Sequence, residues 1–354
     1  MARWWRRSAQ QGGPSELGVP DDGPVAGDLS DRHLLLVPST VGVAQVDLLL
    51  RSRVRDCRLA ETGEVSLGRL SRLTGPYELS MEEAVDAAVP MPWTVVYAVE
   101  APVEREDPPL PGVDDRDGFA RAFPDGLPWR EEGRALHLLA GLARRLHGAV
   151  RTAGTNFVIQ PDPLRAVDYA VHTPFWLEPT VLLGVVAREL PTAALEAQGQ
   201  DWAGPAEEAY TGEIIMADTR ETPLPPEILG RLHAQADVAD LEVLAGEDVI
   251  DAYAVVGAVG AAAADGLVEV LVHGADGDRV ILEQDWAQQP FITYDIRWLC
   301  PDPAEREQLV PPEHHLQSRQ RVRPVVTAVA RAVVEATSGV ITDEDGFLVD
   351  RYSL

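Results

Sequence analysis

The chain has 354 residues, of which 45% are hydrophobic, and its 57 acidic and 30 basic residues give a formal net charge of −27. This hydrophobic content can supply a sizeable core and excludes a wholly disordered chain. Affinity for nucleic acid comes mainly from cationic contacts with phosphate, so the charge disfavours direct nucleic-acid binding. No apolar run reaches the length of about eighteen residues that a membrane-spanning helix needs, and we expect no transmembrane segment.

Missing residue types exclude several mechanisms. All thirty basic residues are arginine, and without lysine there is no Walker-type phosphate loop, no Schiff-base chemistry and no kinase-type ATP lysine. Cys57 and Cys300 are too few for a disulfide framework or a four-thiolate zinc site, and they form no Cys-x-x-Cys pair. We therefore expect reduced thiols in the cytoplasm, and we expect no cofactor and no metal.

Residues 1–30 are predicted to be a flexible leader, because glycine and proline are frequent from residue 8 onward. The leader contains a basic, aromatic cluster at 3–7, with the sequence Arg-Trp-Trp-Arg-Arg. The apolar stretch of a secretory signal does not follow this cluster, so we expect no export. The tryptophan pair either contacts an anionic membrane surface or a partner, or belongs to a frayed end of the chain.

The first predicted element is a strand at 33–38, a short apolar run. A second strand is predicted at 92–97, where aromatic residues alternate with others. Residues 101–128 hold six prolines, which cannot continue a helix or a central strand, so a long surface loop is expected there. Between 131 and 150, apolar residues recur at three- and four-residue spacing and predict an amphipathic helix that faces a core. A further strand is predicted at 156–159.

Strands are more frequent in the rest of the chain. They are predicted at 213–217, 241–244, 267–272, 279–282, 340–342 and 347–349. Helices are predicted at 226–236 and 324–338, the second with Pro324 in its first turn, and 192–198 is interpreted as a short helix. Residues 253–264 are compatible with a buried strand or with a helix of small residues. Strands that cluster in this way favour an α+β class with mainly antiparallel sheets.

Two parts of the chain share one order of features. Near 92–159 and again near 290–342, an aromatic strand is followed by a Pro-containing acidic loop, an amphipathic helix, a glycine stop and a further strand. We interpret this order as a diverged internal duplication, and a chance likeness between two α+β segments is the alternative. The predicted fold is therefore α+β with two related halves. Each half is expected to be a mainly antiparallel sheet with amphipathic helices packed on one face.

The predicted boundaries divide the chain into four parts. They are the leader at 1–30, a first half at 31–190, a connecting segment at 191–204 and a second half at 205–354. Residues 201–354 hold 29 acidic residues and 10 arginines, so the second half is the more acidic one. Because an acidic surface selects basic partners, a protein that binds the second half is expected to have a basic surface.

Histidines and carboxylates are the candidates for catalysis, although their spacing matches no established motif. No two histidines stand three or four residues apart, as metal ligands on a helix do. His137 and His147 lie on the predicted long helix, and Glu313, His314 and His315 form the densest ligand-capable cluster, in a predicted loop. These five are the catalytic candidates, although a partly exposed helix residue or a solvated loop is the favoured explanation of each of them.

Candidate binding residues lie in an aromatic segment bounded by prolines, at 173–179. Phe175 and Trp176 of this segment could present a binding face, and packing in the core explains the same pattern. The chain has no Gly-x-Ser-x-Gly nucleophile elbow, no complete EF-hand loop and no dinucleotide fingerprint.

These observations favour a non-catalytic cytoplasmic protein that acts through protein–protein contacts or as a small regulatory module. The first alternative is a hydrolase whose site is assembled from scattered histidines and carboxylates. It requires that two or more of the five candidates, or His172, converge in one cleft. A weaker alternative is an acidic nucleic-acid mimic, which requires two rows of carboxylates on one face.

Overall fold

The computed structural model describes residues 29–54, 57–110, 115–198, 252–275, 280–288, 290–352 and 354. Nearly all of the predicted leader lies outside these residues, as do the elements predicted at 213–217, 226–236 and 241–244. The chain divides into two compact units. Unit 1 comprises Met1–Leu50, Cys57–Val113 and Asp117–Pro163, and unit 2 comprises Arg51–Asp56, Asp114–Arg116 and Leu164–Leu354. This division falls earlier in the chain than the predicted connecting segment.

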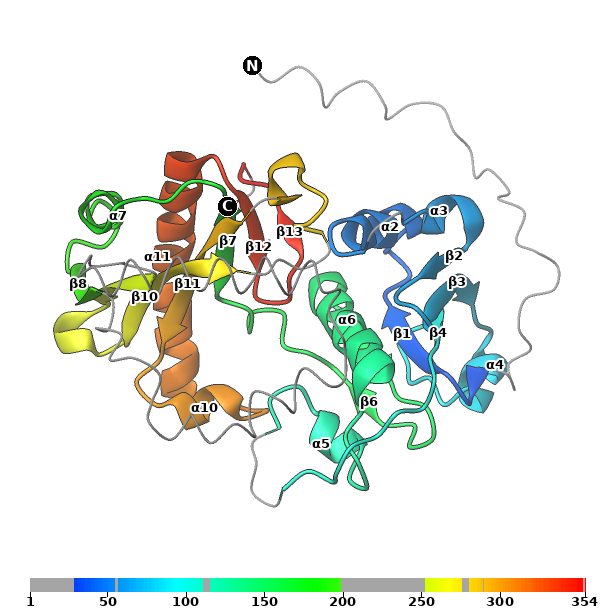
Figure 1. The fold of residues 1–354 in the computed structure, drawn as a ribbon. Helices are drawn as coiled ribbons and strands as arrows, with labels where there is room; N and C mark the ends of the chain where they lie inside the picture. Colours follow the sequence, from blue (N-terminus) through cyan, green and yellow to red (C-terminus); the bar gives the residue numbers. More distant parts are fainter. Residues whose placement is uncertain are drawn as a thin grey trace, which may run out of the picture. The chain divides into compact units, whose positions relative to one another are not determined.

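Unit 1 is built on an antiparallel sheet of six strands, in the order β2-β3-β4-β1-β5-β6 (Figure 1). Its strands are β1 (His33–Val37), β2 (Glu64–Ser66), β3 (Arg72–Glu78), β4 (Val95–Glu100), β5 (Ala149–Arg151) and β6 (Val158–Ile159). Its helices are α2 (Val43–Arg51), α3 (Leu59–Thr62), α4 (Met81–Asp86), α5 (Phe119–Ala122) and α6 (Arg130–Leu146). Strand β1 pairs with both β4 and β5, and all five of its residues are buried.

Different helices cover the two faces of this sheet. A hydrogen bond of 3.0 Å joins His33 Nε2 to Oε1 of Glu132 in α6, so α6 covers the face of the odd-numbered β1 residues. Side chains alternate along a strand, so Leu34 and Leu36 point to the other face. There they pack with Ala84 of α4. The prediction that helices pack on one face therefore does not describe α4.

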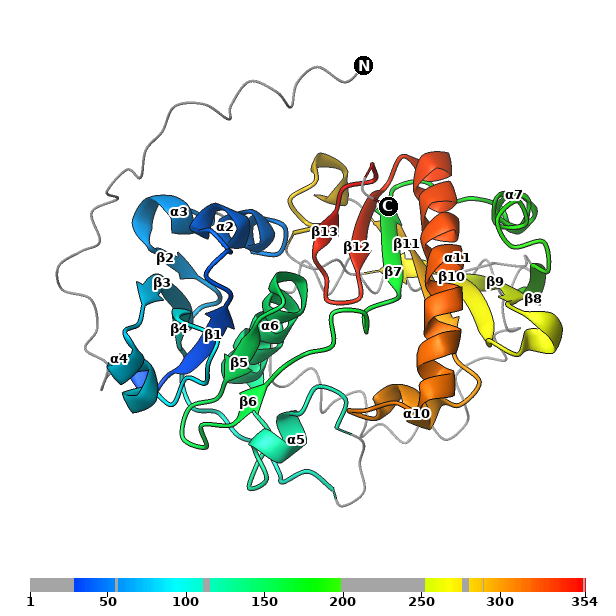
Figure 2. The same ribbon diagram turned by 180° about the vertical axis from the view of Figure 1, so that it is seen from behind.

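Unit 2 is built on an antiparallel sheet of seven strands, in the order β13-β12-β7-β11-β10-β9-β8. Its strands are β7 (Tyr169–Thr173), β8 (Ala194–Gln198), β9 (Ala252–Ala258), β10 (Leu267–Ala275), β11 (Phe291–Leu299), β12 (Val340–Asp343) and β13 (Leu348–Val349). Its helices are α7 (Pro179–Val186), α10 (Pro303–Glu307) and α11 (Glu313–Thr337), with short 3₁₀ turns η2 (Ala261–Ala263) and η3 (Asp285–Gln288). Seen from the other side, α11 runs along the sheet beside β7 and β11, which it contacts (Figure 2).

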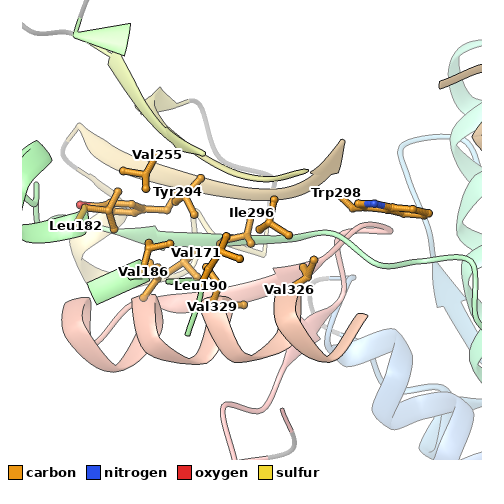
Figure 3. Close-up of a cluster of buried hydrophobic side chains, with 14 of the residues drawn as sticks. Val171, Leu182, Val186, Leu190, Val255, Tyr294, Ile296, Trp298, Val326 and Val329 are labelled. Carbon is orange, nitrogen blue, oxygen red and sulfur yellow. The ribbon is translucent and has the colours of Figure 1, made fainter. Parts of the chain in front are cut away.

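The core of unit 2 lies between α7, α11 and the sheet. Tyr294, Ile296 and Trp298 alternate along β11 and are buried in one cluster with Val326 and Leu182, which α11 and α7 contribute. Figure 3 shows these side chains meeting in one layer between the helices and the strands. Burying an aliphatic or aromatic side chain of this size contributes about 1.5–3 kcal/mol, so this layer is the main stabilising feature of the unit.

The two sheets share a strand order when strands are matched by their place in each unit. Unit 1 has the order β2-β3-β4-β1-β5-β6, and unit 2 has β9-β10-β11-β7-β12-β13, with β8 as an additional edge strand. In both units the first strand lies between the strand that precedes the long helix and the strand that follows it. All pairings in both sheets are antiparallel, which agrees with the predicted α+β class.

The long helix of unit 1 is shorter than predicted. Helix α6 ends at Leu146, and the next residue, His147, has a left-handed backbone with φ 53°. Ala149 and Val150, which were expected in the helix, belong to β5 and pair with β1. A left-handed residue ends a helix because it turns the following N–H groups away from the helical ladder.

The long helix of unit 2 is longer than predicted. Helix α11 begins at Glu313 and contains Pro324 in its interior, so the prediction of a loop at 313–315 is wrong. A proline removes only one intrahelical hydrogen bond, and the residues before it are held by packing, because Ser318 and Val322 are buried. The helix therefore continues through the proline.

Three shorter predictions are also corrected. The segment predicted as a helix at 192–198 contains β8, which pairs with β9. The strand predicted at 279–282 is a turn, where Val280 and Ile281 are buried by packing without strand pairing. The ambiguous segment that starts at residue 253 is strand β9. None of the helices in the described part of the chain combines the length and the apolar character that crossing a membrane requires.

Candidate functional site

A cleft of about 570 Å³ opens at one end of the unit 1 sheet. Its lining residues come from four segments of the chain. They are Pro38 and Ser39 after β1, Met91, Pro92 and Trp93 before β4, His147 after α6 and Gln160 after β6. Antiparallel pairing brings these segments together, because the end of β1 pairs with the beginnings of β4 and β5. We call this site the unit 1 cleft.

The turn between α6 and β5 positions His147 at the cleft. The backbone N–H of His147 donates to the carbonyl of Ala143, and the left-handed conformation it adopts is one in which histidine is found more often than most residues. Gly148 follows and lies so close to the carbonyl oxygen of Leu36 that a Cβ atom would overlap it. This glycine therefore lets the turn sit directly on β1 and holds His147 in place.

The unit 1 cleft combines an apolar wall with a polar rim. Trp93 is 8% exposed and packs in the core cluster of that face, whereas Met91 is 62% exposed. Ser39, His147 and Gln160 are exposed polar residues. Among the residues described, no hydrogen bond joins His147 to Ser39, so these two do not form a nucleophile and base pair. An apolar wall with a few polar groups suits the binding of an apolar side chain or small apolar group.

Exposed apolar residues also lie on α4, the helix that precedes Met91 of the cleft in the chain. Met81 and Val85 are each 73% exposed, and they stand four residues apart, on one side of the helix. The α4 surface is defined here as Met81, Val85 and Met91. It is acidic as well, because 78–86 contains four carboxylates and no arginine occurs between residues 73 and 103. Exposed apolar patches on folded proteins commonly mark interaction sites.

A second cluster of polar residues in unit 1, around Glu132 and His33, is buried and has a structural role. Glu132 accepts hydrogen bonds from His33 and from the backbone N–H of Glu104, and it forms an ion pair with Arg105. His33 Nδ1 accepts from the backbone N–H of Ala153. Burial, with the positive charges of arginines nearby, lowers the pKa of His33 to about 4, so the imidazole is neutral at pH 7. These contacts fasten α6 to β1.

Unit 2 contains a comparable ionic cluster. Arg306 forms ion pairs with Asp168 and Glu344, and Glu344 also pairs with Arg116. Burial raises the pKa of Asp168, whereas at Glu344 the effect of burial is outweighed by Arg116 and Arg306, so its pKa is lowered. Carboxyls with opposite pKa shifts can serve as acid and base. Here, however, the two carboxylates also accept hydrogen bonds from the backbone N–H groups of Trp298 and residue 167. Such contacts hold segments of the fold together and indicate a structural role.

The catalytic candidates of unit 1 are separated along α6. His147 lines the unit 1 cleft, as described above. His137 lies ten residues earlier, about 15 Å along the helix axis, and packs edge-on against Phe119 at 4.8 Å between ring centroids. The structure does not bring these two histidines together in one site.

The candidates of unit 2 occupy the first turn of α11. His314 Nε2 lies 2.6 Å from Glu305 Oε1, whereas His315 is 3% exposed and packs on the ring of Trp298. Burial lowers the pKa of His315. Glu313 accepts a hydrogen bond from Gln317 on the same helix. His172, which the hydrolase alternative also uses, lies in β7 and bonds to two threonine hydroxyls.

The two candidate binding residues have different environments. Phe175 is 59% exposed and follows the end of β7 by two residues. Trp176 is partly buried, packs against the unit 2 core and meets Tyr253 edge-on at 5.1 Å. Core packing therefore accounts for Trp176, and Phe175 is the exposed one of the pair.

The cleft residues were missed by the sequence analysis, apart from His147. Ser39, Met91 and Gln160 belong to no motif, and Pro92-Trp93 was interpreted only as the beginning of a strand. Within the residues that the structure describes, no group of three or more histidines, cysteines, aspartates or glutamates is placed to hold a metal ion. No protein-family model, curated protein or solved structure matches this chain.

Proposed function

We propose that this protein is a non-catalytic protein-interaction module that binds a partner polypeptide at the unit 1 cleft and the α4 surface. The observation that carries this proposal is a cleft with an apolar wall, together with further exposed apolar side chains on the helix that precedes Met91 in the chain. Met91 belongs to the cleft and to the α4 surface, and Met81 and Val85 lie on α4. Methionine is unbranched and adaptable, and it is common on surfaces that bind other proteins.

The chemistry of the α4 surface favours a basic partner. Glu82, Glu83 and Asp86 flank its apolar residues, and no arginine compensates them within the same stretch of sequence. Opposite charges across an interface accelerate association and exclude partners of the wrong sign. We therefore expect a partner segment with one or two large apolar side chains flanked by arginine or lysine. This assigns to unit 1 the preference for basic partners that was expected from the acidic second half.

The alternatives lack a supporting observation. His137 and His147 lie apart on α6, and in unit 2 the histidines described above are engaged with neighbouring carboxylates, hydroxyls or rings. Cys57 and Cys300 are both buried and neither forms a disulfide, which is compatible with the proposed action in the cytoplasm.

We also propose that units 1 and 2 are diverged copies of one ancestral unit. Their strand orders match, and their long helices end in the same way. Both helices end at a residue with left-handed backbone, His147 in unit 1 and Ser338 in unit 2. A glycine follows each of them and lies against a carbonyl of the first strand, at the second-to-last residue. The two pairs are Gly148 with Leu36, and Gly339 with His172.

This proposal changes the predicted boundary between the copies. It assigns β7 and α7 to the second copy, so that the second copy begins near residue 164 and not after 191–204. In matched register, α6 covers the face of β1 that contains Leu35, and α11 covers the face of β7 that contains Val171. The long helices thus lie on faces that match in register, which supports the proposed duplication.

The interaction function is tested by a charge placed in the cleft. Met91→Asp puts a carboxylate on an exposed apolar residue, and Val310→Asp, at a position that is 77% exposed in unit 2, is the matched control. Proteins captured from the native lysate by wild type and both variants are quantified. We expect at least one protein to bind wild type and Val310→Asp and to fall about tenfold or more with Met91→Asp. If every captured protein binds Met91→Asp as well as it binds wild type, the cleft is not the binding site.

A further inference from the structure

One segment of the chain itself has a composition that matches the unit 1 cleft and the α4 surface. Residues 3–7 have the sequence Arg-Trp-Trp-Arg-Arg, with two large aromatic side chains between three positive charges. Arginine and tryptophan are the residues that contribute most often to the energetic centre of an interface. The segment therefore has the composition expected above for a partner of the α4 surface.

The described chain starts next to the α4 side of the sheet. Leu29 is 1% exposed and belongs to the same core cluster as Ala84 of α4 and Trp93 of the cleft. From Leu29 back to residue 7 there are 22 residues, which span up to about 70 Å when extended. A domain of about 160 residues is roughly 40 Å across, so this length reaches any point on unit 1.

The charges and apolar groups on the two sides are complementary. The segment has three arginines, and the stretch that contains α4 has Glu82, Glu83 and Asp86 and no positive charge between residues 73 and 103. The indole rings have an apolar counterpart in Met91, Pro92 and the edge of Trp93. Methionine sulfur and an aromatic ring attract each other beyond simple burial, and arginine can stack on an exposed ring.

We propose that residues 3–7 bind the unit 1 cleft of the same chain and so compete with its partner protein. The inference rests on the proposed function, because it gives the interaction site a regulator that must leave before the partner binds. Tethering gives the segment an effective concentration in the millimolar range, so even a weak contact occupies the cleft appreciably. A contact that depends on three arginines also weakens as salt increases.

The test follows the methionine methyl groups by NMR in the full chain. With ¹³C-methyl methionine, the Met91 resonance reports the cleft and Met81 reports α4. We expect the Met91 resonance to move when Trp4→Ala and Trp5→Ala are introduced together, and to move in the same direction in wild type as salt is raised. Phe175→Ala removes an exposed aromatic ring of unit 2 and is the matched control, for which the Met91 resonance stays in place.

Three outcomes would overturn the inference. In the first, the Met91 resonance is the same with and without the two tryptophans. In the second, the shift depends on protein concentration, which would mean that the segment of a second copy fills the cleft. In the third, an added peptide with the sequence of residues 1–12 fails to move the Met91 resonance of the Trp4→Ala, Trp5→Ala chain. If Met91→Asp still abolishes partner capture, each of these results rejects only the binding of residues 3–7 to the cleft, and the proposed function is unaffected.

Discussion

When the two sheets are matched by strand order, one pair of matching faces is apolar in unit 1 and polar in unit 2. In unit 1, the face of Leu34 and Leu36 is apolar and is covered by α4 and the residues around it. In unit 2, the matching positions of β7 are Ala170 and His172. His172 bonds to the hydroxyls of two threonines on neighbouring strands, and the next polar pair along β11 joins Asp295 to a histidine of β10. One strand order therefore accommodates both an apolar and a polar second face.

The difference between the two sheets indicates that the face covered by the long helix is the more constrained part of the fold. In both units the long helix buries its apolar side against one face of the sheet, and in unit 1 the buried pair of His33 and Glu132 also lies on that face. The second face is free to change once the first supplies enough buried area. In unit 1 it supports α4, which presents Met81 to solvent, and Met91 is exposed in the segment between α4 and β4. We infer that binding specialised in unit 1.

Exchanging residues between equivalent positions has the largest expected effect. Leu36→His places an imidazole in an apolar core, losing a buried leucine and leaving ring nitrogens without partners. We expect a loss of about 4 kcal/mol in the free energy of unfolding. His172→Leu removes two hydrogen bonds to threonine hydroxyls, for an expected loss of about 1–2 kcal/mol. Urea unfolding measures both. Equal losses would contradict the difference between the two faces.

Acid is expected to destabilise unit 1 through a buried histidine. The folded-state pKa of His33 is about 4 and its unfolded value is 6.5, so in this range only the unfolded chain binds the proton. Stability contributed by the neutral imidazole is present above pH 6.5 and is lost as pH falls towards 4. At 1.36 kcal/mol per pKa unit the loss is about 3 kcal/mol.

His33→Gln removes this titration, and the corresponding first residue of β7 is Tyr169. The stability difference between wild type and His33→Gln should therefore shrink as pH decreases from 7 to 4. His137→Gln, at an exposed histidine of α6, controls for the loss of an imidazole as such. Parallel pH profiles for wild type and His33→Gln would show that His33 does not sense the pH.

The helix-ending glycines should respond alike if the two turns are equivalent. A Cβ at Gly339 would lie 2.8 Å from the carbonyl oxygen of His172, and a Cβ at Gly148 would lie closer still to that of Leu36. We expect Gly148→Ala to cost about 3 kcal/mol and Gly339→Ala about 1–2 kcal/mol. Gly184→Ala in α7, where a Cβ meets nothing within 4 Å, should be neutral or slightly stabilising. If Gly339→Ala left the free energy of unfolding unchanged, the two turns would not be equivalent.

The smallest effect on stability is expected in the cleft itself. Met91→Asp changes an exposed side chain, so the free energy of unfolding should change by less than about 0.5 kcal/mol. Thermal unfolding followed by circular dichroism checks this value. A larger loss would mean that Met91 supports the fold, and a decrease in partner capture by this variant would then have a structural cause.

The parts of the fold that local periodicity controls were predicted from the sequence. The apolar stripes of α6 and α11 identified both long helices, because the same residues that repeat along the helix are the ones buried. The end of α6 was missed because its left-handed residue is His147, whereas a glycine was expected in that conformation, but the end of α11 at Thr337 lies within one residue of the prediction. The Ala-rich segment at 192–198 has helical propensity, but pairing with β9 makes it a strand.

Features that depend on distant parts of the chain were not predictable from one sequence. Strand β7 pairs with β11, more than a hundred residues later, so composition near 191–204 could not locate the boundary between the units. The cleft is assembled from four segments, and only their pairing in the sheet brings Ser39, Met91 and Gln160 together. The catalytic candidates were chosen by residue type, which does not show that His315 is buried against an aromatic ring.

The central claim is that unit 1 binds a partner at its cleft and that the corresponding corner of unit 2 does not. Phe175 lies two residues after β7, as Ser39 lies two residues after β1, and it is the exposed apolar residue at that corner. The decisive measurement is the dissociation constant of the captured partner for Met91→Asp and Phe175→Asp, by calorimetry. We expect Met91→Asp to raise the dissociation constant about tenfold or more and Phe175→Asp to leave the dissociation constant unchanged. If only Phe175→Asp weakened partner binding, the partner would bind unit 2 and not the unit 1 cleft.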